Sequence, residues 1–287
     1  MSQMHGTPIR KTRLRPPVVA TDLVPRTRPR DALADGLARP LTLVCAPAGY
    51  GKTSLVSAHL ATVDTPVAWL TLEDSDATPN RLARLIAAAV GHAIPDAFAD
   101  LDSHLQSRSD PRELASWLAD ELDEVETELV LVLDELERVS DGDAHSLLTA
   151  LVEYPPQPLH LVVITRHDPP WPLASLRAHG SLREIRQADL AFRPGEVRLF
   201  VEGATGLVLD DDAVARIHER TEGWPAAVRM IVLGLGDATA PDELLMRLPR
   251  GVAHVEEFLA EAVLARQPED VRSLLMRTAL VERVDAR

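Results

Sequence analysis

The sequence is poor in cysteine and in aromatic residues. Its 287 residues include one cysteine, Cys45, and aromatic side chains make up 3% of the chain. One cysteine excludes an internal disulfide framework and is typical of a reducing compartment, so we expect a cytoplasmic protein. Because Cys45 ends an apolar run, we expect it to be an inert core residue. With so few aromatic rings, the core has to be built mainly from Leu, Val and Ala.

Positive charge and long apolar runs are also lacking. The formal net charge is −14, which argues against bulk electrostatic binding to nucleic acid or to an anionic membrane. We find no convincing helix-turn-helix with a basic recognition helix, so direct DNA binding by this chain is not expected. No segment reaches the roughly 18 uninterrupted apolar residues of a membrane span. The basic N-terminus is not followed by an apolar stretch, so a secretory signal is not expected.

What is present is an ordinary globular composition, with 46% hydrophobic and 26% charged residues, and a change of pattern along the chain. In the first part, short apolar runs alternate with amphipathic helical segments, which predicts an α/β domain with a mainly parallel sheet. The later part is helical only. We therefore divide the chain into an extended N-terminal arm (1–30), an α/β domain (31–192), a small helical domain (193–250) and a further helical region (251–287).

The individual elements follow from periodicity and from capping residues. Strands are expected over residues 40–45, 66–72, 128–133, 159–164 and 182–187. Helices are expected over 30–37, from 79, from 111, and over 194–202, 210–220, 225–233, 241–248, 252–266 and 268–276. Thr78 and Asp110 each precede a proline, which makes them expected N-caps, and Glu113 would complete a capping box with Asp110.

The segment Ala46-Pro-Ala-Gly-Tyr-Gly-Lys-Thr53 follows an expected strand and precedes an expected helix. This context is typical of a phosphate-binding loop, in which glycines let successive backbone N–H groups point at one anion. The lysine can reach the β- and γ-phosphates, and the threonine hydroxyl can ligate Mg²⁺. Ala46 replaces the usual first glycine, which is tolerable if its φ is negative. The alternative is a glycine turn with a chance lysine. The predicted phosphate-binding residues are Ala48, Gly49, Tyr50, Gly51, Lys52, Thr53 and Ser54.

Two acids, Asp134 and Glu135, follow the apolar run Leu129-Val-Leu-Val-Leu133. A buried parallel strand delivers its last side chains to the carboxyl edge of the sheet, where ligands bind in open α/β folds. Asp134 can hold Mg²⁺ there, directly or through water, and Glu135 can polarise an attacking water as general base. The alternative is that the two acids merely end a strand. Together with the lysine-threonine loop they indicate a Mg–nucleotide site.

Two arginines are further candidates for the same site. Arg166 follows the expected strand 159–164, where a fixed guanidinium could sense a bound nucleotide or stabilise transferred charge. A surface ion pair is an equally good interpretation of Arg166. The arm that contains Arg26 is basic and proline-rich, so it could touch nucleic acid, or pack across a domain face and form a wall of the nucleotide pocket.

Several segments together resemble the MalT-type regulators of the STAND class of signal-transduction ATPases, many of which are large LuxR-type transcription activators. The segments are Leu23-Val-Pro-Arg26, Ala46–Thr53, Val67-Ala-Trp-Leu-Thr-Leu72, Leu131-Val-Leu-Asp-Glu135, Thr165-Arg-His-Asp-Pro-Pro170 and Arg220-Thr-Glu-Gly-Trp224. The resemblance implies a P-loop NTPase fold with a mainly parallel sheet, followed by a helical lid domain and the start of a winged-helix region at 251–287. The sensor and DNA-binding domains of such regulators are expected to be absent from this chain.

The resemblance also implies roles for residues. Lys52 and Thr53 fall on the Walker A positions, Asp134 and Glu135 on Walker B, and Arg166 on the sensor position. Trp224 and Pro225 match the element that lines the adenine side, although Trp224 is equally well explained as a core residue of the helical domain. Arg26 matches a nucleotide contact from the N-terminal side. In the family, ADP locks a closed form, while inducer and ATP open it and drive self-association.

The function expected from the sequence is that of an ATP/ADP-binding switch module with Mg²⁺ as cofactor and slow ATP hydrolysis. Lys52, Glu135 and Arg166 would be its catalytic residues. The alternative is a non-catalytic nucleotide-binding domain that assembles with other chains. A conventional ATPase motor is disfavoured because no arginine finger is recognisable in the chain.

Overall fold

The computed structural model describes residues 9–18, 24–95, 97–98, 110–139, 142–157 and 159–234. The chain divides into two compact units, with the boundary between Leu190 and Ala191. Ala48–Tyr50, from the glycine-bearing loop, group with the second unit. The predicted division into four segments stays a prediction, and the region 251–287 lies outside the described residues.

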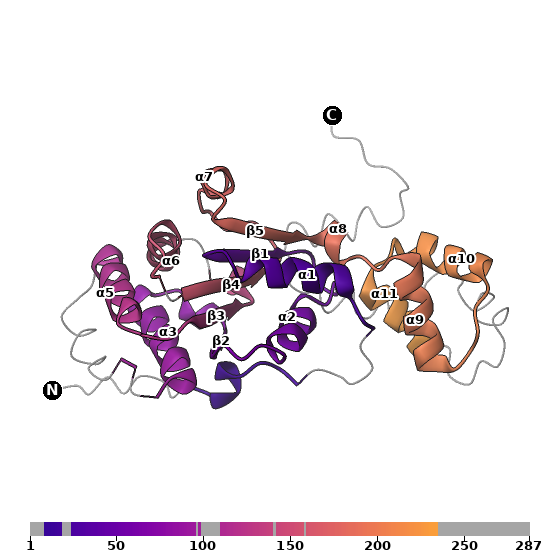
Figure 1. The fold of residues 1–287 in the computed structure, drawn as a ribbon, viewed down its shortest axis with the longest axis horizontal. Coiled ribbons are helices and arrows are strands. Elements are labelled where there is room, and N and C mark those ends of the chain that lie inside the picture. Colours follow the sequence, from indigo (N-terminus) through magenta and orange to yellow (C-terminus); the bar gives the residue numbers. More distant parts are fainter. Residues whose placement is uncertain are drawn as a thin grey trace, which may run out of the picture. The chain divides into compact units, whose positions relative to one another are not determined.

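The first unit is built on a five-stranded sheet in which every neighbouring pair is parallel, in the order β2-β3-β4-β1-β5 (Figure 1). Its strands are β1 (Leu41–Cys45), β2 (Val67–Thr71), β3 (Leu129–Asp134), β4 (Leu159–Thr165) and β5 (Leu182–Arg186). β1 and β3 are buried along their whole length, as expected of strands covered on both faces, whereas the edge strand β5 is only partly buried. The predicted α/β fold with a mainly parallel sheet is confirmed.

Helices cover both faces of this sheet. They are α1 (Thr27–Gly36), α2 (Lys52–Leu60), α3 (Pro79–Ala93), α5 (Pro111–Asp123), α6 (Asp143–Glu153), α7 (Leu173–Ala178) and α8 (Gln187–Leu190). One face packs against α3, α5 and α6 in a large core made mostly of leucine, valine and alanine (Figure 1). On the other face α1 contacts β1, β5 and α2. The approach of α1 is close, because a Cβ at Gly36 would come within 2.4 Å of the Thr42 hydroxyl.

Local signals placed some helix ends correctly and others wrongly. α3 begins at Pro79 after Thr78, although the Thr78 side chain makes no capping bond. Asp110 does cap α5, through a 2.9 Å hydrogen bond from the amide of Arg112. The first helix begins at residue 27 rather than 30, and α6 and α7 were not predicted.

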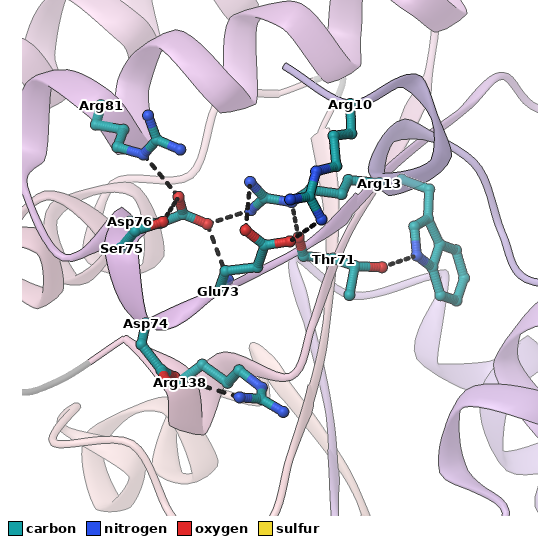
Figure 2. Close-up of polar contacts among 10 residues, drawn as sticks. Arg10, Arg13, Thr71, Glu73, Asp74, Ser75, Asp76, Arg81 and Arg138 are labelled. Atoms are coloured by element: carbon teal, nitrogen blue, oxygen red, sulfur yellow. Dashed lines mark hydrogen bonds and ion pairs between the residues drawn. The ribbon is translucent and has the colours of Figure 1, made fainter. Parts of the chain in front are cut away.

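The described part of the N-terminal arm is tied to the end of β2. A short 3-10 helix, η1 (Lys11–Leu14), contacts β2 and α3. Arg13 is buried; its Nε donates to the carbonyl of Thr71 at 2.8 Å, and its guanidinium pairs with the fully buried carboxylate of Asp76 (Figure 2). Arg81 donates to the same carboxylate at 2.8 Å. This part of the arm therefore packs on the α/β domain and is not wholly extended.

The second unit contains α9 (Pro194–Thr205), α10 (Asp211–Thr221) and α11 (Pro225–Gly234) around a small apolar core. α9 runs past Gly203, where we expected its end, because the left-handed residue that stops it is Gly206, with φ 72°. The helices predicted over 241–248, 252–266 and 268–276 lie outside the described residues. Among the helices of the described part, none is long and apolar enough to cross a membrane.

Candidate functional site

The loop between β1 and α2 has the backbone of an anion-binding turn. Gly49 and Gly51 have φ values of 80° and 72°, a region that favours glycine, and Gly51 is the N-cap of α2. Ala46 is not among the non-glycine residues with positive φ, so its replacement of the usual glycine introduces no strain. A Cβ at Gly51 would meet no atom of the described residues within 4 Å, so the space beside the N-cap of α2 is open at that position. Free N–H groups and a positive dipole at such a helix start favour a phosphate.

Lys52 is the first residue of α2, and its side chain turns back over the loop. Its Nζ donates to the carbonyls of Ala46 at 2.7 Å and Pro47 at 3.0 Å. Burial lowers the pKa of Lys52, and the negative charge of Glu137 opposes that shift. Within the described residues the hydrogen bonds of this partly desolvated ammonium are to neutral carbonyls, and it can exchange them for an anion with a gain in electrostatic energy.

Thr53 and Asp134 meet across the edge of the sheet. The Thr53 hydroxyl donates to Oδ1 of Asp134 at 3.1 Å, and the same oxygen accepts the amide of Glu135 at 3.0 Å. Burial raises the pKa of Asp134 to about 6, although the hydrogen bond from Thr53 opposes the shift. A hydroxyl and a carboxylate oxygen at this distance are hard donors of the kind that Mg²⁺ prefers, and water and phosphate oxygens usually complete its shell. The pair fits a magnesium ion.

Glu135 and Arg166 belong to one chain of ion pairs at the same edge. Glu135 has a left-handed backbone, with φ 58°, and is followed by the 3-10 turn η3 (Leu136–Arg138). Its carboxylate accepts Nε of Arg138 at 2.8 Å and lies 3.8 Å from Nη2 of Arg166. The closer partner of Arg166 is Glu137, at 2.6 Å from Nε. No role was predicted for Glu137, whose only signal in the sequence is that it is a third acid two residues after Glu135.

Strand order explains why these side chains converge. β4 lies between β1 and β3, so Arg166, directly after β4, falls between the loop that follows β1 and the acids that end β3. Lys52 therefore experiences the charges of Glu137, Arg166, Asp134 and Glu135. Among the described residues, no cluster of three or more His, Cys, Asp or Glu is arranged to hold a metal by itself. A magnesium ion here would depend on the phosphates of a nucleotide for part of its shell.

Two of the other predicted site residues, Arg26 and Trp224, form hydrogen bonds with backbone carbonyls. Nη2 of Arg26 donates to the carbonyl of Leu190 at 2.5 Å. Within the second unit, Nε1 of Trp224 donates to the carbonyl of Ala48 at 3.0 Å, and Pro225 begins α11. Tyr50 is buried, and Ser54 lies exposed in the first turn of α2.

Cys45 ends β1 next to this site and is buried. Burial raises the pKa of its thiol to about 11, a shift that the charge of Arg186 opposes. The thiol therefore stays protonated at neutral pH and lacks the thiolate that a nucleophile or metal ligand requires.

Comparison with known proteins finds a matching family model and curated relatives. Residues 37–168 match a family model described as an AAA domain. The chain is 31% identical over 284 residues to the serine/threonine-protein kinase PknK of Mycobacterium tuberculosis. The aligned region covers 96% of this chain and 25% of PknK. It is 28% identical over 248 residues to the HTH-type transcriptional regulator MalT of Yersinia enterocolitica, covering 84% of this chain and 27% of MalT. The chain thus spans about a quarter of these relatives' length.

Solved structures agree on the fold. The Walker-type ATPase PABY2304 of Pyrococcus abyssi superposes with a TM-score of 0.58 at 16% identity, covering 93% of this chain and 79% of that one. A RuvB variant of Thermotoga maritima superposes with a TM-score of 0.50 at 16% identity, covering 90% and 86% of the two chains. At these identities the likeness is one of fold alone. The family match, the regulator relatives and the fold together show a P-loop ATPase domain related to the MalT-type transcriptional regulators. A P-loop fold of this kind implies nucleotide binding.

Proposed function

We propose that this chain is a nucleotide-dependent switch module that binds ATP or ADP with Mg²⁺ at the carboxyl edge of its sheet. The observation that carries the proposal is the hydrogen bond from Thr53 to Asp134, 3.1 Å long, next to the Lys52 ammonium. These are the three groups that a Mg–triphosphate requires together: a hydroxyl, a carboxylate and a cation. Asp134 lies 81 positions after Thr53 in the sequence, so the fold itself brings the carboxylate to the loop.

Each residue has a defined part in this proposal. Backbone N–H groups from Ala48 to Ser54 hold the phosphates, Lys52 contacts the β- and γ-phosphates, and Thr53 and Asp134 hold Mg²⁺. The bound magnesium neutralises charge on the phosphate oxygens. Glu135 orients an attacking water, and Arg166 reaches the γ-phosphate. Arg26, Trp224 and Pro225 line the base and ribose side, an assignment that rests on the family resemblance.

Hydrolysis in this proposal is slow. The Glu135 carboxylate is engaged by Arg138 at 2.8 Å, and this ion pair competes with a hydrogen bond to an attacking water. A switch needs a long-lived nucleotide state, which slow turnover provides. From the family resemblance, the ATP state would favour self-association, with residues 31–192 as nucleotide-binding domain, 193–250 as lid and 251–287 as the start of a winged helix.

Calorimetric titration with ATP and ADP, in magnesium and in EDTA, tests the site. We expect Lys52→Ala to weaken ATP binding about 100-fold, which corresponds to roughly 2.7 kcal/mol, because the phosphates lose their principal side-chain cation. Its thermal unfolding should stay close to that of the wild type, since among the described residues Lys52 bonds to carbonyls of its own loop. Equal affinities in the two proteins would contradict the proposed phosphate contact.

The second candidate is a nucleotide-binding scaffold without turnover, which the Glu135–Arg138 ion pair also permits. Phosphate release distinguishes the two. An ATPase predicts release above background that disappears in Glu135→Gln. A scaffold predicts nucleotide binding with no release from either protein. Light scattering in ATP and in ADP then shows whether self-association depends on the nucleotide.

A further inference from the structure

Glu137 is an acidic residue of the site to which neither the motifs nor the resemblance assigned a role. It lies in the η3 turn with 14% of its side chain exposed. One carboxylate oxygen, Oε1, pairs with Nε of Arg166 at 2.6 Å. The other, Oε2, is buried and has no hydrogen-bond partner among the described residues. A half-satisfied buried carboxylate is unfavourable, so it calls for a physical explanation.

The backbone of η3 explains why Glu137 faces Arg166. The left-handed conformation of Glu135 turns the chain at the end of β3, and Leu136, 1% exposed, anchors the turn in the core. The amide of Arg138 bonds to the carbonyl of Glu135 at 3.0 Å, which closes the turn. Glu135 is then held by Arg138, and Glu137 is left to pair with the guanidinium at the end of β4.

The distances rank the two acids that compete for Arg166. Its Nε–Glu137 contact of 2.6 Å is a charge-assisted hydrogen bond, whereas the Nη2–Glu135 separation of 3.8 Å is an ion pair without one. Arg166 is 17% exposed, so water screens this pair only partly. An anion that draws Arg166 toward the phosphate loop competes with Glu137 for the guanidinium.

We propose that Glu137 is a positioning residue that holds Arg166 until the γ-phosphate of ATP replaces it, and thereby sets the preference between ATP and ADP. The inference rests on the proposed function, because it requires a nucleotide at the loop. ADP has no γ-phosphate and leaves the Arg166–Glu137 pair intact. ATP gains a guanidinium contact but breaks that pair, so the pair lowers the selectivity for ATP.

The test compares dissociation constants for ATP and ADP in Glu137→Gln, which removes the charge and keeps the shape. We expect the ratio of ADP to ATP dissociation constants to rise about five- to tenfold over the wild type, a change within the usual net range for one intramolecular hydrogen bond. Loss of a negative charge near the phosphates strengthens binding of both nucleotides. The ratio, rather than either affinity, is therefore the measurement that isolates the effect of Arg166.

Three further variants make the result specific. In an Arg166→Ala background, Glu137→Gln should leave the ratio unchanged, because the guanidinium that it releases is missing. Glu137→Asp keeps the charge but withdraws it by one methylene, so its ratio should fall between wild type and Glu137→Gln; it also serves if the glutamine variant does not fold. Asp74→Asn removes an exposed charge that pairs with Arg138, which lies in η3 beside Glu137 (Figure 2). Its ratio of ADP to ATP dissociation constants should match that of the wild type.

The possible failures are distinguishable. If the wild type binds both nucleotides in a Lys52-dependent way, but Glu137→Gln does not move the ratio, the positioning role is wrong and the switch site stands. The role is also wrong if Glu137→Gln moves the ratio equally with and without Arg166. A wild type that binds neither nucleotide overturns the proposed function and this inference together.

Discussion

Two polar clusters lie at the ends of parallel strands of one sheet, and they differ in how completely their groups are paired. The first, which we call the Asp76 cluster, comprises Arg13, Glu73, Asp76 and Arg81 after β2 (Figure 2). The second, the phosphate-loop cluster, comprises Lys52, Thr53, Asp134, Glu135, Glu137 and Arg166 after β1, β3 and β4. Both bury carboxylates near cations.

The Asp76 carboxylate is fully buried and accepts hydrogen bonds from Arg13, from Arg81 at 2.8 Å and from the amide of Glu73 at 2.8 Å. Burial alone would raise its pKa, but these bonds outweigh burial and hold the pKa below its usual value. Asp134, 4% exposed, has a pKa raised to about 6 by burial. A paired cluster stabilises the fold, whereas an incompletely paired one keeps bonding capacity for a ligand.

The largest effect that would test this contrast is expected at Asp76. Asp76→Asn removes the charge that compensates buried Arg13, so it should lower the free energy of unfolding by about 3–5 kcal/mol. Urea unfolding measures the change, and Asp74→Asn, exposed and two residues away, should stay within about 0.5 kcal/mol of the wild type. A small loss at Asp76 would mean that the cluster is not structural.

The matching substitution in the phosphate-loop cluster, Asp134→Asn, should raise the free energy of unfolding instead of lowering it. In the folded protein Asp134 is harder to ionise than in the unfolded chain, so its charge destabilises the metal-free fold at neutral pH. Asp134→Asn should therefore raise the free energy of unfolding in EDTA by roughly 1–3 kcal/mol, at about 1.4 kcal/mol for each unit of pKa shift. The same variant should lose the magnesium dependence of ATP binding. Destabilisation comparable to that of Asp76→Asn would erase the distinction between the clusters.

The smallest expected effect is a pH dependence that sharpens the comparison. Because the folded-state pKa of Asp76 is lowered from 3.8, its stabilisation is present above that value and is lost as the pH falls through the folded-state pKa. The difference in unfolding free energy between wild type and Asp76→Asn should be constant from about pH 5 to 7 and shrink below about pH 3.8. Unfolding curves at several acidic pH values measure it, and a difference unchanged at pH 3 would contradict the pairing.

Sequence patterns predicted what depends on neighbours along the chain. A strand before the loop, the glycines of the loop and a helix after it followed from local propensity, and all three are found. The acids Asp134 and Glu135 were recognisable because they end an apolar strand. Glu137 and Asp76 were not recognisable as partners of arginines, since their pairs join residues that are 29 and 63 positions apart in number.

The sequence by itself determined the α/β class, the phosphate-loop motif and the acids at the end of β3, because side-chain periodicity and glycine conformation are properties of short segments. The tertiary structure decided that β4 lies between β1 and β3, and hence that Arg166 falls among Lys52, Glu135 and Glu137. It also decided which groups pair with each carboxylate. Strand order and ion pairing depend on how the whole sheet and its helices pack, and no local pattern encodes that packing.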